Sequence, residues 1–224
     1  MYEFRIGGKS VSVFPSAEPD APVIYLNTYA DEGQQVFQAV QAAGCPPFTL
    51  IAIGSTDWNR DMAPWDSPAA FKSGEPFSGE ADEYLCLLVE EILPRAEKGL
   101  IGTPAWRGIV GYSLGGLFAL YAIYQTEIFS RVGSISGSLW FSGLKQYILT
   151  HEPKRPPDCA YFSLGDKESK TRNPILKSVR RDTEEIYAFY RAAGIDTVFQ
   201  LNPGNHYNHA AERTAAGIAW LLSR

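Results

Sequence analysis

Cysteine is scarce in this 224-residue chain, which carries only Cys45, Cys86 and Cys159 and no Cys-x-x-Cys pair. An odd and sparse set argues against a disulfide framework and against a cysteine-ligated zinc site, and it predicts reduced thiols. A basic excess is also missing, because 20 Lys and Arg stand against 25 Asp and Glu, for a net charge of -5. This balance argues against nucleic acid or an anionic membrane surface as a partner.

Long hydrophobic runs are absent as well. No apolar stretch approaches membrane-spanning length, and the first residues lack the basic segment and apolar run of a signal peptide. We therefore expect a cytoplasmic protein that has no membrane partner. Hydrophobic residues make up 45% of the chain and charged residues 20%, which is ordinary for a globular protein with a sizeable core. The length fits a single domain over residues 1–224.

Apolar runs of strand length alternate with segments of helical spacing through most of the chain. Strands are predicted at 23–26, 48–53, 107–112, 131–136, 159–164 and 197–201, and helices at 34–43, 81–93, 114–124, 143–150, 173–193 and 210–222. Two short alternating runs on either side of Gly7-Gly8 predict an antiparallel hairpin at the start. This order predicts an α/β fold with a mostly parallel sheet, helices on both faces, and a site at the carboxyl ends of the strands.

Two prolines and a long loop interrupt this pattern. Pro94 should end or kink the helix predicted at 81–93, and Pro174 suits the first turn of the helix predicted at 173–193. The segment 54–79 is long and shows no regular helix or strand pattern, and a loop of that length in a compact domain usually has a function.

The most informative stretch is Gly111-Tyr112-Ser113-Leu114-Gly115, a Gly-x-Ser-x-Gly pattern. A predicted strand precedes it and a predicted helix follows at once, which is the context that this motif requires. A serine between a strand and a helix takes a strained backbone conformation, and small neighbours such as Gly111 and Gly115 relieve the crowding. The pattern predicts Ser113 as a nucleophile that faces the N-terminus of the new helix.

A serine hydroxyl needs a base, and only His151, His206 and His209 are available. His151 is expected to be a solvated residue at the end of a helix. The other two follow the last predicted strand, where the base of this kind of fold lies. We favour His206, because it is closer to the strand end and Pro203-Gly204 would turn it across the site. His209 is expected to cap or pack against the last helix.

The remaining groups should come from two other strand-end loops. The acid should follow the strand at 159–164, where Asp166 and Glu168 are both suitable, and spacing alone does not decide between them. The backbone N–H of Leu114 should donate to the oxyanion, together with a second N–H from Thr28 or Tyr29. No metal and no cofactor are expected.

Four segments stand in one order: Gly111-Tyr-Ser-Leu-Gly-Gly-Leu117, Ser134-Ile-Ser-Gly-Ser-Leu-Trp140, Leu164-Gly-Asp-Lys-Glu168 and Pro203-Gly-Asn-His206. With them the chain, from about Pro22 to its end, resembles the "putative esterase" family of α/β-hydrolases. That family includes enterochelin and related siderophore esterases, esterase D, feruloyl esterases and mycolyltransferases. The resemblance implies an α/β-hydrolase fold, with Ser113 as nucleophile and His206 as base. It favours Glu168 as the acid, three residues beyond Gly165.

The resemblance also implies a substrate site. Arg60-Asp-Met-Ala-Pro-Trp65 looks like the Arg-Asp-x-x-Pro-Trp loop of siderophore-esterase-like members, so Arg60 and Trp65 are expected to bind substrate. Trp140 and Phe141 would add an apolar wall, although Trp65 and Trp140 fit a core position equally well. The chain has no room for a large lid.

The expected function is hydrolysis of a small-molecule carboxylic ester through an acyl-enzyme intermediate. Two alternatives keep the same fold: hydrolysis of a catecholate trilactone siderophore, and thioester hydrolysis or acyl transfer.

Overall fold

A computed structural model describes residues 1–224. Its centre is an eight-stranded sheet in the order β1-β2-β4-β3-β7-β8-β9-β10. The strands are β1 (Tyr2–Ile6), β2 (Lys9–Phe14), β3 (Val23–Asn27), β4 (Thr49–Gly54), β7 (Arg107–Tyr112), β8 (Arg131–Ile135), β9 (Cys159–Gly165) and β10 (Asp196–Asn202). From β4 to β10 every neighbouring pair is parallel, whereas β1 pairs with β2, and β2 with β4, in antiparallel fashion.

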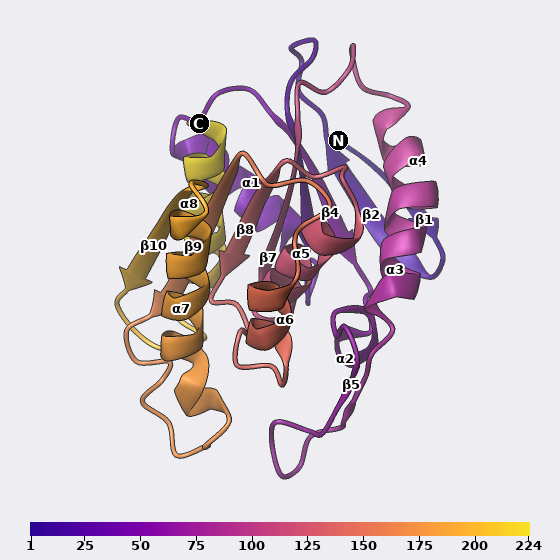
Figure 1. Ribbon diagram of the computed structural model, residues 1–224. Helices are drawn as coiled ribbons and strands as arrows, with labels where there is room; N and C mark the ends of the chain where they lie inside the picture. Colours follow the sequence, from indigo (N-terminus) through magenta and orange to yellow (C-terminus); the bar gives the residue numbers. More distant parts are fainter.

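Helices cover both faces of the sheet, as Figure 1 shows. They are α1 (Gly33–Ala42), α2 (Trp58–Asp61), α3 (Ala81–Leu87), α4 (Leu93–Glu97), α5 (Leu114–Gln125), α6 (Leu144–Thr150), α7 (Val179–Ala192) and α8 (Ala210–Leu222). One hydrophobic cluster packs α1 and α8 against the sheet, and a larger one packs α3, α5, α6 and α7 against the opposite face. The mostly parallel sheet with helices on both faces confirms the predicted α/β class. The central strands have mostly apolar sequences because they are buried on both faces. No helix has the combination of length and hydrophobicity that would let it cross a bilayer.

The predicted hairpin is present. Gly7 and Gly8 both have positive φ angles, 54° and 79°, so the two-residue loop between β1 and β2 has the left-handed backbone of a type I′ turn. Ile6 faces Lys9 across this turn, and the register continues from there to the pair of Tyr2 and Val13.

The helix predicted at 81–93 does not end at Pro94. Helical backbone continues to Glu97, because a π-helical segment, Leu88–Ile92, lies between α3 and α4. The wider turn lets the Leu93 N–H donate to the Leu88 carbonyl five residues earlier, and it places Pro94 in the first turn of α4. There the missing N–H of proline costs little.

The helix predicted at 173–193 begins later than expected. A short 3₁₀ turn, Leu176–Ser178, precedes α7, and Pro174 lies outside both. The Asn173 side chain explains the delay, since it donates to the Ala70 carbonyl (2.6 Å) and accepts from the Ile175 N–H (3.0 Å). Such side chain to backbone bonds compete with helix formation.

The long segment 54–79 has little regular structure, as expected. It contains α2 and a two-stranded pair of β5 (Asp66–Ser67) and β6 (Phe77–Ser78). Asp61 is buried at the end of α2, where it forms an ion pair with Lys9 of β2. This pair ties the irregular segment to the sheet.

Candidate active site

Ser113 stands alone in the turn between β7 and α5. Its φ and ψ are 57° and -122°, a strained combination for a residue with a side chain, and its N–H donates to the Ile135 carbonyl (3.1 Å). The expectation of a strained backbone therefore agrees with the structure. Small residues make the turn possible, since a methyl group on Gly111 would lie 2.1 Å from the Gly115 carbonyl carbon.

We predict that Gly111→Ala lowers the free energy of unfolding by about 3 kcal/mol or more, because backbone must move to admit the methyl group. Gly44→Ala is the matched control. Gly44 has a φ of 71° but open space around it, so its substitution tests conformational strain without a clash and should cost only about 1 kcal/mol. Urea denaturation of both variants measures the difference. Equal losses would contradict the steric account.

Three side chains from three loops meet at this turn. The Nε2 atom of His206, in the loop after β10, is 3.0 Å from the Ser113 Oγ. The Nδ1 atom of the same ring is 2.8 Å from the Oε2 atom of Glu168, in the loop after β9. The His206 side chain is 30% exposed and that of Glu168 only 5%, so the imidazole is open to solvent and the carboxylate is not. This order allows proton transfer from the serine to the imidazole, with a carboxylate to orient the ring.

Asp166 points elsewhere. Its carboxylate accepts the Gly204 N–H (2.7 Å), and it makes no contact with the imidazole of His206. Between the two carboxylates that spacing left open, Glu168 is therefore the one that reaches the histidine. Asp166 helps to fix the loop that carries His206.

The second oxygen of Glu168 is held by several donors. Its Oε1 accepts from the Gly165 N–H (2.5 Å) and the Ser136 Oγ (2.8 Å), and the Arg213 Nη1 lies 3.4 Å away. Burial raises the pKa of this carboxyl, but the hydrogen bonds from His206, Gly165 and Ser136 outweigh burial, and the net pKa is below its usual value. Glu168 is thus ionised at neutral pH and fixed in orientation.

Arg213 is a residue that sequence reasoning missed. It lies on α8, is 4% exposed, and donates to the carbonyls of Pro203 (2.9 Å) and Asn205 (3.0 Å). Its guanidinium therefore joins the loop that carries His206 to the carboxylate of Glu168. The available signal was a lone arginine in a helix of small apolar residues, because a buried charge needs specific partners.

The lowered pKa of Glu168 gives a pH prediction. Its contribution to stability is fully present above the ordinary pKa of 4.5 and is lost as the pH falls through the lower pKa of the folded state. We expect wild type and Glu168→Gln to differ most in free energy of unfolding above about pH 5, and to converge as the pH falls. Urea midpoints over a pH series measure this. A difference that grows on acidification would contradict it.

The backbone N–H groups of Leu114 and Tyr29 make no hydrogen bond within the protein, so both are free to donate to an oxyanion. Thr28 is not, because its N–H and its hydroxyl both donate to the Ile53 carbonyl (2.8 Å and 3.0 Å). Of the two residues that the sequence left open for the second donor, Tyr29 is therefore better suited than Thr28, and the assignment stays a prediction. The β3 end also lies against the turn, since a methyl group on Gly115 would be 3.4 Å from the Asn27 carbonyl oxygen.

Two further side chains adjoin the turn. The buried Ser138 has its Oγ 3.3 Å from the Ser113 Oγ, and its N–H donates to the Ser113 carbonyl (3.0 Å). The Trp58 ring lies beside Gly115 and makes an edge contact with the Tyr29 ring, whose side chain is 70% exposed. Sequence reasoning did not single out Ser138 or Trp58 as site residues, since both come from loops whose course depends on packing.

The aromatic residues expected to bind substrate are divided between core and surface. Phe141 is 2% exposed and belongs to the core, so it offers no surface to a ligand. Trp140 and Trp65 are half-buried against that core. The Trp65 Nε1 donates to the Ser142 carbonyl (2.8 Å), which fixes the ring in place.

Arg60, His151 and His209 make no hydrogen bond to Ser113, whose hydroxyl has His206 and Ser138 as partners. Arg60 is about half exposed and forms an ion pair with Glu80 (3.2 Å). His151 is exposed at the end of α6, as expected, where it stacks on the Tyr147 ring. His209 occupies the N-cap position of α8 but its side chain makes no capping bond there.

The fold and the strand–Ser113–helix turn define an α/β-hydrolase-type protein. Residues 20–188 match the family model "Putative esterase", and the chain belongs to this family. Membership supports ester hydrolysis as the chemistry and a small-molecule ester as the substrate.

Individual relatives resemble the chain over nearly its whole length. It is 23% identical to the uncharacterized protein YbbA of Bacillus subtilis (strain 168), with 99% of this chain and 96% of that protein aligned. The siderophore hydrolase EstA of Aspergillus nidulans is 20% identical with a TM-score of 0.76, and 99% of this chain and 93% of that one are covered. An IroE-like serine hydrolase from Shewanella oneidensis is 18% identical with a TM-score of 0.77, covering 96% and 76%. At these identities the two solved structures show a shared fold.

Proposed function

We propose that the protein is a serine carboxylesterase in which Ser113 is the nucleophile, His206 the base and Glu168 the acid. One observation carries the proposal: a continuous hydrogen-bonded path runs from the Ser113 Oγ through His206 to Glu168, with distances of 3.0 Å and 2.8 Å. The order of these residues along the chain, serine, acid and histidine, is that of α/β-hydrolases. Family membership supports the same class of reaction.

In the proposed reaction the Ser113 Oγ attacks the ester carbonyl carbon while His206 Nε2 takes the hydroxyl proton. The carbonyl π electrons move to the oxygen, and this oxyanion accepts from the free N–H groups of Leu114 and Tyr29. His206 then protonates the departing alcohol, which leaves an acyl group on Ser113. Water then attacks the acyl carbon while His206 Nε2 takes one of its protons. The bond between that carbon and the Ser113 Oγ breaks, the imidazolium returns the proton to Oγ, and the carboxylic acid leaves. Glu168 keeps the imidazole oriented and stabilises its charged form throughout.

A siderophore ester is the narrower candidate substrate. EstA, which shares the fold, is described as a siderophore hydrolase. Two exposed aromatic rings support a substrate with a large or aromatic group. Tyr29 lies on the proposed oxyanion loop, and the Tyr207 ring makes an edge contact with His206. Acyl transfer and thioester hydrolysis would use the same groups.

A substrate panel tests the proposal. Wild type and Ser113→Ala are assayed with p-nitrophenyl esters of graded chain length, a feruloyl ester, S-formylglutathione and a catecholate trilactone, with and without an added alcohol acceptor. Serine-dependent turnover of the oxygen esters alone supports the esterase, and preference for the trilactone supports the siderophore substrate. Preference for the thioester would instead indicate a thioesterase. A new ester product that forms only with the added alcohol would indicate an acyltransferase.

A further inference from the structure

The outer edge of β1 is unpaired. β1 is the last strand of the sheet on its side and pairs only with β2. Because Ile6 and Lys9 close the hairpin turn, the hydrogen bonds to β2 fall on Tyr2, Phe4 and Ile6. The N–H and C=O groups of Glu3 and Arg5 therefore point away from the sheet, where another strand could pair with them.

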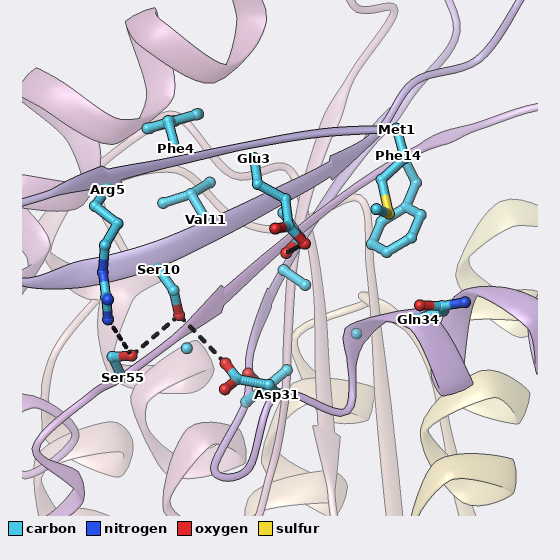
Figure 2. A pocket seen from close by; sticks show the side chains of 15 residues that line it. Met1, Glu3, Phe4, Arg5, Ser10, Val11, Phe14, Asp31, Gln34 and Ser55 are labelled. Carbon is cyan, nitrogen blue, oxygen red and sulfur yellow. Dashed lines mark hydrogen bonds between the residues drawn. The ribbon is translucent and has the colours of Figure 1, made fainter.

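The two faces of β1 differ. Phe4 points to the side covered by α3 and α4, where the Arg95 guanidinium lies 4.6 Å from its ring centre. Glu3 and Arg5 point to the opposite side, over an open groove of about 520 Å³ between the hairpin and the start of α1 (Figure 2). No helix covers this second side of β1, so its charged side chains are accessible.

The charges of Glu3 and Arg5 have no partner of opposite sign within the chain. Glu3 accepts from the Ser12 hydroxyl (3.0 Å), and Arg5 donates to the Ser55 hydroxyl (3.3 Å), the bond drawn in Figure 2. The other edge strand, β10, contrasts with this, because its single charged residue, Asp196, already lies 3.5 Å from Arg224. Only β1 presents free charges of both signs along an edge.

We propose that two copies of the chain pair through their β1 strands, antiparallel, about a twofold axis at Phe4. Glu3 of one copy then lies opposite Arg5 of the other, twice by symmetry, and these are the residues whose backbone groups point outward. Each such pair exchanges two backbone hydrogen bonds and brings a carboxylate beside a guanidinium on the open face. Phe4 faces Phe4 on the axis, and Tyr2 faces Ile6. The two sheets thereby become one.

The register is specific because the neighbouring registers are unfavourable. Outward-pointing groups occur at every second residue, so the partner strand can shift only in steps that keep those groups opposed. One such step places Glu3 opposite Glu3, and the step in the other direction places Arg5 opposite Arg5. Like charges directly opposite destabilise strand pairs. The opposite charges of Glu3 and Arg5 therefore favour the register centred on Phe4 and disfavour the two neighbouring registers.

A single strand pair is a small interface, so we expect a reversible dimer whose population rises with concentration. Sedimentation velocity over a concentration series measures it, with any affinity tag placed at the C-terminus to keep β1 free. Glu3→Arg and Arg5→Glu each create like-charge pairs and should raise the dissociation constant about tenfold or more. Glu18→Arg, a charge reversal in an exposed loop, is the matched control and should leave it unchanged.

The mixing experiment separates this register from any other interface. An equimolar mixture of Glu3→Arg and Arg5→Glu should dimerise again, because each copy then presents one sign to the other, and the double variant should also regain the dimer. Hydrogen exchange should show that the amides of Glu3 and Arg5 become protected as concentration rises. A monomeric wild type, single variants that dimerise as well as wild type, a mixture that stays monomeric, or a dimer with unprotected amides would each overturn the proposal.

Discussion

Ser113→Ala should lower kcat by about 10⁵- to 10⁶-fold for every ester that the protein hydrolyses, with little change in KM. The reason is that the nucleophile, and not a binding contact, is removed. Alanine fits the turn, since it keeps the Cβ atom that serine already has at a φ of 57°. The variant should therefore fold, and its melting temperature should stay close to that of wild type. Initial rates with the preferred ester of the panel measure the loss.

Ser138→Ala is the matched control for this prediction. Its hydroxyl lies 3.3 Å from that of Ser113, but it lies outside the path that runs through His206 to Glu168. We expect it to retain activity within about tenfold of wild type, the scale of one lost hydrogen bond. Substantial hydrolysis by Ser113→Ala would remove the serine from the mechanism. A larger loss in Ser138→Ala than in Ser113→Ala would move the nucleophile to the neighbouring loop.

The fold could be predicted from the sequence where burial alone determines local structure. The central residues of β3 and β7 are apolar or glycine and are buried. Such a run predicts a strand of a parallel sheet that is covered on both faces. Helix ends were less predictable. Before α7, the Asn173 side chain bonds to the backbone and delays the start of the helix. Before Pro94, a π-helical turn lets the helix continue past the proline. Neither effect has a signature in the neighbouring sequence.

The candidate site could be predicted only as a set of strand-end loops, and the catalytic roles of its residues stay predictions. Parallel strands bring their carboxyl ends to one edge, so the loops after β7, β9 and β10 had to lie near one another. Which side chain of a loop reaches the centre depends on the turn. After β9 the Glu168 N–H donates to the Gly165 carbonyl (3.1 Å), and this tight turn brings the Glu168 carboxylate back toward His206. Arg213 could not be found in this way, because its contacts arise from the packing of α8.

Glu168→Gln should lower kcat by about 10³- to 10⁴-fold, the second largest effect that we expect. The amide nearly matches the carboxylate in shape, so the loop should keep its course. It has no negative charge to stabilise the imidazolium, and its NH₂ group can hold the ring in the wrong tautomer. Replacement also leaves the buried Arg213 beside a neutral group, so the free energy of unfolding should fall as well. Stopped-flow or steady-state rates and urea denaturation measure the two effects.

Asp166→Asn is the matched control, since it makes the same chemical change two residues away. Asp166 accepts one backbone N–H from Gly204 and does not touch the imidazole, so we expect a loss of less than about tenfold. Glu168→Asp adds a test of distance, because the shorter side chain cannot reach both His206 and the donors around Gly165 and should lose activity while it keeps its charge. The reverse order, with Asp166→Asn the more damaging change, would make Asp166 the acid. Equal and small losses in all three variants would reduce the mechanism to a pair of Ser113 and His206, with no carboxylate partner needed for turnover.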